Sequence, residues 1–358
     1  MFKHQFSYNR QINIPYLLKI GNGKIIKIGK YLFDKEMYDI AVFWGEGIKE
    51  IIGQDFYLGI NDCKINILYE KVVDCVAWEE VSETAFNLSP KTTAILGIGG
   101  GKALDFAKYC AYLLKIPYIS VPTSAANDGF CSPSASLTFQ GNRKSVKSAI
   151  PYGVVVDLDI INRNPDIFLY AGVGDMVSKI SALFDWKQAS LKGFERYNDF
   201  AAMLSYNSLD LLFLRHSDNI RSPQFQRSLI NSLLYSGIAM EIAGTSRPAS
   251  GSEHLISHAL DKIALHPAMH GLQVGVASYL CARLQNNPES SKLKDMLESS
   301  GFFAFIKNKP LDKCDFIKAL ELAPKIKNDY YTILSEQNAF ENALDLINTD
   351  EVLQDLIV

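Results

Sequence analysis

Residues 93–114 read Thr93-Ala-Ile-Leu-Gly-Ile-Gly-Gly-Gly-Lys-Ala-Leu-Asp-Phe-Ala-Lys-Tyr-Cys-Ala-Tyr-Leu-Leu114. The first four residues form an apolar run that predicts a buried strand, and this run leads directly into Gly97-Ile-Gly-Gly-Gly101. From Ala103 to Leu114 the apolar residues recur at helical spacing. A strand, a glycine-rich turn and a helix in this order are typical of α/β folds.

Strands and helices also alternate on both sides of this stretch. Helical patterns follow the apolar runs, and a polar segment between 134 and 150 has the pattern of a β-hairpin. Short apolar strands separated by helices indicate a parallel sheet that helices cover on both faces. The additional strands are expected at 39–44, 64–70, 116–121 and 153–157.

After Pro165 the pattern is helical almost to the end of the sequence, without the β-branched runs of strands. We therefore predict an α/β domain over 1–163 and an all-α domain over 164–358. A single continuous α/β domain is the alternative. The helices are expected at 173–193, 196–215, 225–243, 250–264, 270–285, 290–306, 312–324 and 335–357.

The composition is that of a globular chain: 48% of the 358 residues are apolar, which suffices for a sizeable core and two domains. With 36 basic and 39 acidic residues and no basic stripe, the charge pattern argues against a nucleic-acid partner. We expect neither a targeting nor a membrane-spanning segment, because residues 1–10 lack an apolar run and no uninterrupted apolar stretch approaches ~20 residues. The six scattered cysteines favour reduced thiols in the cytoplasm over a cysteine zinc site.

The glycines at 97–101 are either a tight turn or a cradle for an anion. Glycines between a strand and a helix let the backbone approach a phosphate, whose charge then lies at the helix N-terminus. A second loop, Val121-Pro-Thr-Ser124, leaves the expected sheet at the same edge, where open α/β sheets bind ligands. Two such loops on one edge favour the cradle.

Four of the six histidines fall between residues 254 and 270. His254 and His258 are one turn apart on an expected helix, and His270 begins the next one. Imidazoles on adjacent helices suit a divalent metal, and a carboxylate would complete an open catalytic site. The best candidate is Asp175, at the expected start of the first helix of the second domain. Surface or capping histidines are the alternative.

Four further polar residues have open roles. His258 is better assigned as a site residue that does not bind the metal, since a catalytic metal needs a free position for substrate. Asp128, just past the Val121–Ser124 loop, is either a turn residue or part of the site. Lys144 and Lys147 on the hairpin are expected to be solvated, with a phosphate contact as the alternative.

These segments together resemble the metal-dependent alcohol dehydrogenase and dehydroquinate synthase superfamily, and in particular the sn-glycerol-1-phosphate dehydrogenase family. The resemblance spans about residues 15–285. It implies a Rossmann-like dinucleotide-binding domain followed by an α-helical metal- and substrate-binding domain, the dehydroquinate synthase-like arrangement. The motifs that carry it are GIGGGKALDFAK, ISVPTSAANDGFCSP, VVVDLDII, AGVGDMVSK, GSEHLISHALD and HGLQVGV.

The resemblance implies a nicotinamide cofactor, NAD or NADP. Its pyrophosphate is expected in the glycine loop, and the following loop supplies further contacts. The expected cofactor residues are Gly99, Gly100, Gly101, Lys102, Ala103, Asp105, Thr123, Ser124 and Ser132.

It also implies one divalent metal, normally zinc in this family and iron or nickel in relatives. The matching ligands are Asp175, His254 and His270, the set that the clustering indicates. Asp128 and His258 match positions that contact substrate, as does Asp175. We therefore expect these three to be the catalytic residues.

The implied reaction interconverts dihydroxyacetone phosphate and sn-glycerol 1-phosphate, a step of phospholipid biosynthesis. The expected partner is thus a small phosphorylated polyol or ketone, and we expect a homo-oligomer without membrane insertion. The sequence departs from the family twice: Asn127 stands where His is usual, and Leu272 where Glu is usual.

Other functions on the same scaffold are a glycerol dehydrogenase and a reductase of another phosphorylated ketone or aldehyde. A sugar-phosphate cyclase of the dehydroquinate synthase type is disfavoured, because residues 131–136 lack its Gly-Gly-Lys-Thr stretch. A non-enzymatic module is disfavoured by the three intact ligand positions.

Overall fold

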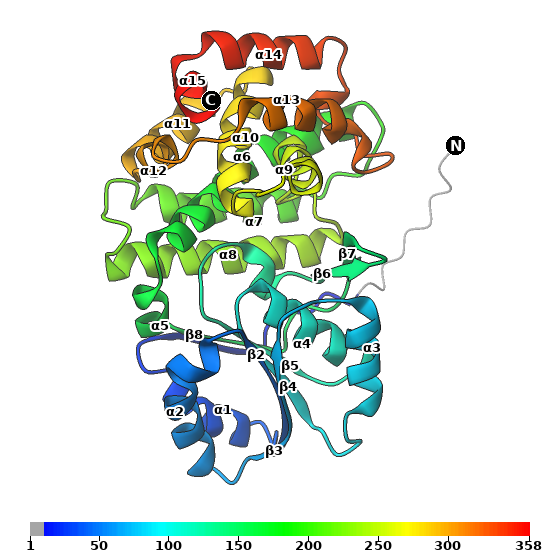
Figure 1. The fold of residues 1–358 in the computed structure, drawn as a ribbon, viewed down its shortest axis with the longest axis vertical. Coiled ribbons are helices and arrows are strands. Elements are labelled where there is room, and N and C mark those ends of the chain that lie inside the picture. Colours follow the sequence, from blue (N-terminus) through cyan, green and yellow to red (C-terminus); the bar gives the residue numbers. More distant parts are fainter. Residues whose placement is uncertain (1–10) are drawn as a thin grey trace.

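The computed structural model describes residues 11–358, so the expectation for residues 1–10, including the first part of the predicted 1–163 domain, lies outside the described residues. The chain forms a sheet-containing part below and a helical part above (Figure 1). The sheet has six strands in the order β1-β8-β5-β4-β2-β3, and every neighbouring pair is parallel. Its strands are β1 (Leu17–Gly21), β2 (Asp39–Gly45), β3 (Asn66–Val73), β4 (Ala94–Gly99), β5 (Tyr118–Pro122) and β8 (Gly153–Asp157).

Helices cover both faces of this sheet, as expected for a parallel sheet. Alternate residues of β2 point to opposite faces: Val42 belongs to the cluster that includes α1 and α2, whereas Phe43 belongs to the cluster that includes α3 and α4. Figure 1 shows the two helix pairs on opposite sides of the sheet. The four helices are α1 (Ile28–Phe33), α2 (Ile48–Asn61), α3 (Trp78–Asn87) and α4 (Gly101–Leu114).

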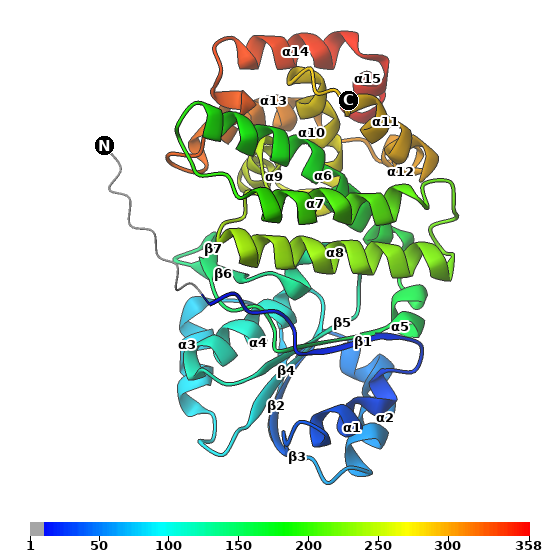
Figure 2. The ribbon, with the colours of Figure 1, turned by 180° about the vertical axis from the view of Figure 1, so that it is seen from behind.

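The predicted hairpin is present as β6 (Ser134–Phe139) and β7 (Asn142–Lys147), an antiparallel pair outside the main sheet. Lys144 and Lys147 are exposed, as expected. Both views place the hairpin beside one end of α8 (Pro223–Ala243), near the junction of the two parts (Figure 2).

The second half of the chain is helical, which confirms the predicted fold class. Helix α8 lies across the top of the sheet-containing part, and the remaining helices pack above it (Figures 1 and 2). The helices are α5 (Leu158–Arg163), α6 (Asp166–Leu191), α7 (Asp199–Phe213), α8 (Pro223–Ala243), α9 (Ser252–Ile263), α10 (His270–Leu284), α11 (Ser290–Ser299), α12 (Phe302–Lys307), α13 (Lys313–Leu322), α14 (Ala339–Thr349) and α15 (Glu351–Leu356).

Two segments that we expected to form single helices are each divided into two helices. The segment 290–306 divides into α11 and α12 at Gly301, whose φ of +82° is left-handed and ends a helix. The segment 335–357 divides into α14 and α15 at Asp350, whose side chain accepts hydrogen bonds from the first backbone N–H groups of α15. Apolar spacing continues across both breaks, and only the backbone geometry separates the elements.

Helix α6 is the central helix of the upper part. It is long and apolar enough to cross a membrane, but 72% of its most apolar window is buried inside the protein. The same large cluster joins Met176 of α6 to Val154 of β8 and Phe130, so the two halves share a core. The domain boundary between 163 and 164 stays a prediction.

Candidate metal and cofactor site

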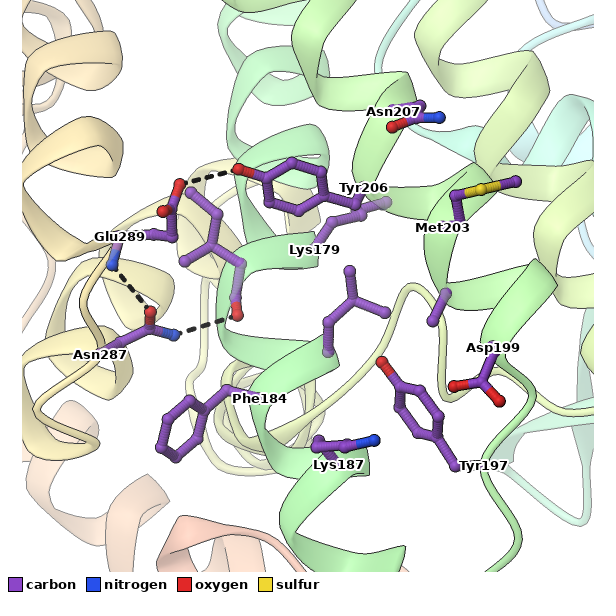
Figure 3. Close-up of a pocket in the computed structure, with 13 residues that line it drawn as sticks. Lys179, Phe184, Lys187, Tyr197, Asp199, Met203, Tyr206, Asn207, Asn287 and Glu289 are labelled. Carbon is purple, nitrogen blue, oxygen red and sulfur yellow. Dashed lines mark hydrogen bonds between the residues drawn. The ribbon is translucent and has the colours of Figure 1, made fainter.

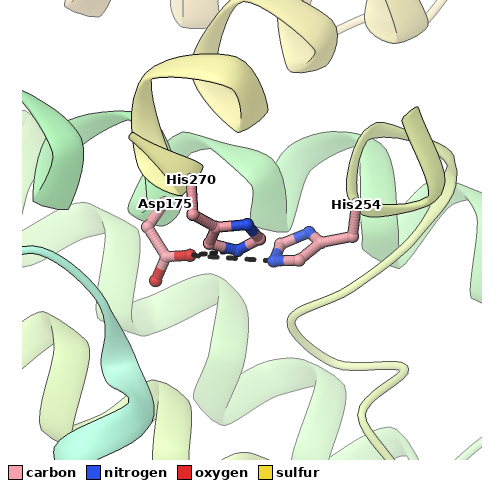
Figure 4. A group of neighbouring side chains, drawn as sticks. All are labelled: Asp175, His254 and His270. Atoms are coloured by element: carbon pink, nitrogen blue, oxygen red, sulfur yellow. Dashed lines mark ion pairs between the residues drawn. The ribbon is translucent and has the colours of Figure 1, made fainter. Parts of the chain in front are cut away.

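Asp175 on α6, His254 on α9 and His270 on α10 bring their side chains together (Figure 4). One ligand atom of each lies within 4.8 Å of the other two. Nε2 of His254 and Nε2 of His270 lie 3.7 Å and 3.9 Å from Oδ1 of Asp175. Donors around a tetrahedral zinc, each at about 2.0–2.1 Å, are about 3.3 Å apart, so a small contraction would complete the geometry. The donor set fits a divalent metal.

The other ring nitrogens of both histidines are held by neighbouring polar groups. Nδ1 of His254 donates to Oε1 of Glu253 at 2.8 Å. Nδ1 of His270 lies 2.9 Å from Oγ of Ser257, which itself donates to Gln273 at 2.6 Å. Hydrogen bonds at Nδ1 leave Nε2 as the free lone pair of each ring and fix its direction. Both rings therefore present their Nε2 atoms toward Asp175 for metal binding.

The second oxygen of Asp175 is anchored from the opposite side. Oδ2 accepts a hydrogen bond from the backbone N–H of Asp128 at 3.1 Å and lies 3.7 Å from Nζ of Lys179. Lys179 also contacts Oδ2 of Asp128 at 3.2 Å, and Ser236 donates to that same oxygen at 2.6 Å. These contacts place Asp128 beside the three candidate ligands, where the sequence resemblance assigns a substrate contact.

Charges in the centre decide which side chains carry protons. Burial alone would raise the pKa of Asp175, but Lys179 and His254 outweigh it and hold this pKa below its usual range. Burial and the neighbouring His254 lower the pKa of His270 to about 4. Asp175 is thus a carboxylate and His270 a neutral imidazole at neutral pH, which are the forms that bind metals.

His258 lies against the same centre without being one of the three converging donors. Its ring stacks on that of His270, with the centroids 5.7 Å apart. Burial, His270 and His254 lower the pKa of His258 well below its ordinary value, and the positive charges of Lys327 and Arg143 add to this effect. His258 is therefore a neutral, half-buried imidazole next to the metal donors.

Close backbone contacts at two glycines allow the elements that carry the candidate ligands to pack against one another. A Cβ atom on Gly174 would lie 2.0 Å from the carbonyl oxygen of Gly271, and one on Gly172 would lie 2.0 Å from that of Ala125. The two glycines thus let α6 approach both α10 and the loop after β5. Asp175 was expected at a helix start and instead lies inside α6, which begins at Asp166. The helix begins nine residues before Asp175 because Pro165 and Asp166 supply its N-terminal signals.

The glycine loop lies between β4 and α4 at the carboxyl edge of the sheet. Strand β4 continues to Gly99, so the turn begins later than the expected 97–101, while the assignment of Gly99 to the cofactor stays a prediction. A Cβ on Gly97 would press within 2.8 Å of Ala107, and one on Gly99 within 2.9 Å of the backbone of β2, which explains both glycines by packing. Gly100 and Gly101 have no atom within 4 Å of an added Cβ, so the N-terminus of α4 faces open space. This space fits the phosphates of a dinucleotide.

The second loop begins next to the end of β4, since the backbone N–H of Thr123 donates to the carbonyl of Gly99, the last residue of β4, at 3.0 Å. Lys102 lies at the start of α4, 2.8 Å from the carbonyl of Asp74 and 3.5 Å from the carboxylate of Glu46. Ala103 is buried, and Ser124 is half-buried. These cofactor assignments stay predictions.

Asp105 and Ser132 both lie near Lys108 in the interior. Lys108 is 3.6 Å from Asp105 and 3.4 Å from Oγ of Ser132, and it donates to the carbonyls of Gly129 and Ser134 at 2.6 Å and 2.7 Å. Lys108 therefore ties α4 to the loop that carries Asp128. Asp105 and Ser132 stay predicted cofactor residues.

Sequence reasoning missed four polar residues that organise the site. Lys179 could have been found from its spacing, because it lies one helical turn after Asp175. Glu253 is next to His254 in the sequence, but neighbouring residues on a helix ordinarily point apart, and the other two act through contacts that folding creates. The missed residues are Lys108, Lys179, Glu253 and Ser257.

The two departures from the family pattern have structural roles. Oδ1 of Asn127 accepts a hydrogen bond from the backbone N–H of Gly129 at 3.0 Å and so caps the turn that carries Asp128. Leu272 is buried in the large hydrophobic cluster. Neither residue adds a charge to the candidate centre.

A separate groove of about 440 Å³ lies between α6, α7 and the segment after α10 (Figure 3). Tyr206 donates to Glu289 across it at 2.9 Å, and Asn287 donates to the carbonyl of Ile180 at 3.2 Å. Lys179 is the one polar residue of the metal centre that also lines this groove. The groove contains no histidine and no glycine-loop residue, so we assign the chemistry to the centre around Asp175.

Comparisons with known proteins show which family this chain resembles in sequence and fold. Residues 19–165 match the family model described as iron-containing alcohol dehydrogenase. The chain is 35% identical over 335 residues to glycerol-1-phosphate dehydrogenase (NAD(P)+) of Metallosphaera sedula, covering 91% of this chain and 93% of that protein. It is 36% identical over 344 residues to the enzyme of the same name from Methanosphaera stadtmanae, covering 94% and 97%. Among solved structures, glycerol dehydrogenase from Schizosaccharomyces pombe aligns with a TM-score of 0.77 at 18% identity, covering 97% of this chain and 92% of that one, which shows a shared fold.

Proposed function

The chain belongs to the glycerol-1-phosphate dehydrogenase family, and from this premise we propose that it catalyses the NAD(P)-linked interconversion of dihydroxyacetone phosphate and sn-glycerol 1-phosphate. The observation that carries the proposal is the convergence of Asp175, His254 and His270. A divalent metal, which we propose to be zinc, would supply a Lewis acid for the C2 oxygen of the substrate, and the nicotinamide would supply or accept hydride.

The chain's own residues bind and orient the reactants. Asp128 lies next to Asp175, and its carboxylate is held by Lys179 and Ser236, so it can accept a hydrogen bond from a substrate hydroxyl. His258 is neutral and offers a ring nitrogen to hold a substrate oxygen or relay its proton. Asp128 and His258 would thus fix the three-carbon skeleton on two sides of the donor cluster.

The cofactor would lie at the carboxyl edge of the sheet. The open space over Gly100 and Gly101 supports a pyrophosphate there, where the first backbone N–H groups of α4 and the helix dipole favour negative charge. The connection of Thr123 to Gly99 supports a continuous cofactor surface between the two loops. A homo-oligomer stays a prediction.

The first test is consumption of NADH or NADPH by zinc-loaded protein that is given dihydroxyacetone phosphate. We expect rapid reduction, and in the reverse direction oxidation of sn-glycerol 1-phosphate but not of sn-glycerol 3-phosphate. Oxidation of glycerol without turnover of the phosphate esters would make the protein a glycerol dehydrogenase. Conversion of a sugar phosphate without net change in cofactor would make it a cyclase.

The metal assignment has its own test. His254→Ala should abolish zinc retention after dialysis and lower turnover below about 1% of the parent protein, because an open catalytic site has only three protein ligands. His266→Ala is the matched control, since His266 is exposed and lies outside the cluster. Full activity and stoichiometric zinc in the His254 variant would overturn the ligand assignment.

A further inference from the structure

Lys327 is a half-buried cation that forms no ion pair with any residue of the described part of the chain. It lies between η3 (Ala323–Lys325) and η4 (Ile333–Ser335), in the segment after α13. Its Nζ atom lies 3.4 Å from Oγ of Ser246 and 4.4 Å from the centre of the Tyr330 ring, and both of these groups are neutral. Within residues 11–358, no carboxylate oxygen lies within 4.0 Å of this ammonium group.

The nearby charges are already used. Arg247 packs on the Tyr330 ring, with its guanidinium carbon 3.4 Å from the ring centre, and donates from Nε to both carboxylate oxygens of Glu195 at 2.8 Å. Glu253, a buried carboxylate beside the metal centre, is bound by His254. Burial and Arg247 lower the pKa of Lys327 to about 8. Glu253 and Glu195 offset only part of this effect, and neither forms an ion pair with the Lys327 ammonium group.

The position of Lys327 is linked to the candidate metal centre by short contacts. Ser246 begins the segment 246–250 that leads into α9, and the carbonyl of Ala249 in this segment accepts a hydrogen bond from Ser178 at 3.1 Å. Ser178 is three residues from Asp175 on α6 and also donates to its carbonyl, at 2.7 Å. The segment that carries Lys327 is also bound to the turn before α9, because the hydroxyl of Tyr330 donates to the carbonyl of Ser250. Lys327 therefore lies beside the turn that leads into α9, the helix of His254 and His258.

We propose that Lys327, with the hydroxyl of Ser246, binds the phosphate group of the substrate. The inference rests on the proposed function and adds to it the group that distinguishes a phosphorylated ketone from a plain one. A phosphate dianion would give the Lys327 ammonium the counter-charge that it lacks and would accept a hydrogen bond from Oγ of Ser246. The cofactor phosphates are expected at the N-terminus of α4, on the sheet, whereas Lys327 belongs to the helical part.

Steady-state kinetics of Lys327→Met test this assignment. We expect the KM for dihydroxyacetone phosphate to rise about 10- to 100-fold, the loss typical for a hydrogen bond to a charged group, with a smaller change in kcat. The rate with unphosphorylated dihydroxyacetone and the KM for NADH and for NADPH should stay unchanged. Lys327→Arg keeps the charge and should recover part of the loss. Lys325→Met is the matched control, since it removes an exposed lysine two residues away.

A binding measurement separates this proposal from a purely structural role. Calorimetric titration of inorganic phosphate into the parent protein should show binding that competes with the substrate and that Lys327→Met weakens to the same degree as it raises KM. The Tm of the ligand-free Met variant should be equal to or above that of the parent, because an unpaired buried charge is removed.

Three outcomes would overturn the proposal while leaving the proposed function intact. The first is a parent enzyme that reduces dihydroxyacetone phosphate while Lys327→Met keeps the same KM. The second is an equal loss of activity with dihydroxyacetone, and the third is a raised KM for NADPH alone, which would assign Lys327 to the cofactor. A parent enzyme without any turnover of dihydroxyacetone phosphate would instead refute the proposed function.

Discussion

Oε1 of Glu253 lies 2.8 Å from Nδ1 of His254, the next residue in the sequence, and both side chains are buried at the start of α9. Glu253 also accepts hydrogen bonds from the backbone N–H of Gly251 and from Ser181, at 2.6 Å and 2.7 Å. Adjacent residues on a helix ordinarily point in different directions. Here the contact fixes the His254 ring and places a negative charge behind it.

Glu253→Gln should therefore weaken metal binding. The glutamine keeps the shape and can still accept from His254, but it removes the charge that makes the imidazole a stronger ligand. We expect zinc affinity to fall about 10- to 100-fold, and activity to recover at saturating zinc. Chelator competition measures the affinity, and Glu321→Gln, at an exposed site, is the control. An unchanged zinc affinity would show that Glu253 has no role in orienting the ligand.

Metal binding should depend on pH through His254 and not through His270. Burial would lower the pKa of His254, but the hydrogen bonds with Asp175 and Glu253 outweigh it and raise this pKa above 6.5. The pKa of His270 is about 4, because burial and His254 lower it. A ligand must lose its proton before the metal binds. Between about pH 6.5 and 5 the proton on His254 therefore competes with zinc, and the zinc affinity falls about tenfold for each pH unit.

Zinc titrations from pH 5 to 8 measure the slope of zinc affinity against pH, after correction for the pH dependence of the chelator itself. A slope of two protons would show that His270 also carries a proton in the metal-free protein. A flat profile would show that His254 is not a ligand or that its pKa is low.

Gly174→Ala should destabilise the fold. The added Cβ would lie 2.0 Å from the carbonyl oxygen of Gly271, so α6 and α10 must separate. We expect a loss of about 3 kcal/mol or more in the free energy of unfolding, measured by denaturant titration. Gly53→Ala in α2 is the control: the nearest atom to its Cβ is 3.5 Å away, and stability should stay equal or rise by about 0.5–1 kcal/mol. Equal stability of both variants would contradict the close packing of α6 on α10.

Gly100→Ala should separate cofactor binding from stability. No atom lies within 4 Å of the added Cβ, and the backbone φ of −86° suits alanine, so the fold should be unaffected. The methyl group would occupy the space expected for the cofactor phosphates and raise the KM for NAD(P)H about tenfold or more. Cofactor fluorescence titration and thermal unfolding measure the two effects. Unchanged cofactor affinity would move the pyrophosphate away from this loop.

The expected strands at 39–44, 116–121 and 153–157 are confirmed because each is a short apolar run between turn residues, a local signal. Strand β1 was missed although 17–20 is also a short, mainly apolar run between turn residues; among the described strands it pairs with β8 alone, and Leu17 lies opposite Gly153, far along the chain. The pattern likewise joined α11 to α12, since apolar spacing continues through the left-handed Gly301. Local periodicity reports which face is apolar and not where the backbone turns.

By itself the sequence determined the fold class and the candidate metal donors, because strand and helix periods, glycine turns and clustered histidines are all local. Only the tertiary structure decided how these groups act. It brings Lys179 and Asp128 together at 3.2 Å from segments 51 residues apart, and it leaves Lys327 beside Ser246 without an ion pair to any residue from 11 onward. Such contacts depend on backbone approach, as between Gly174 and Gly271, and close approach follows from three-dimensional packing that no local pattern contains.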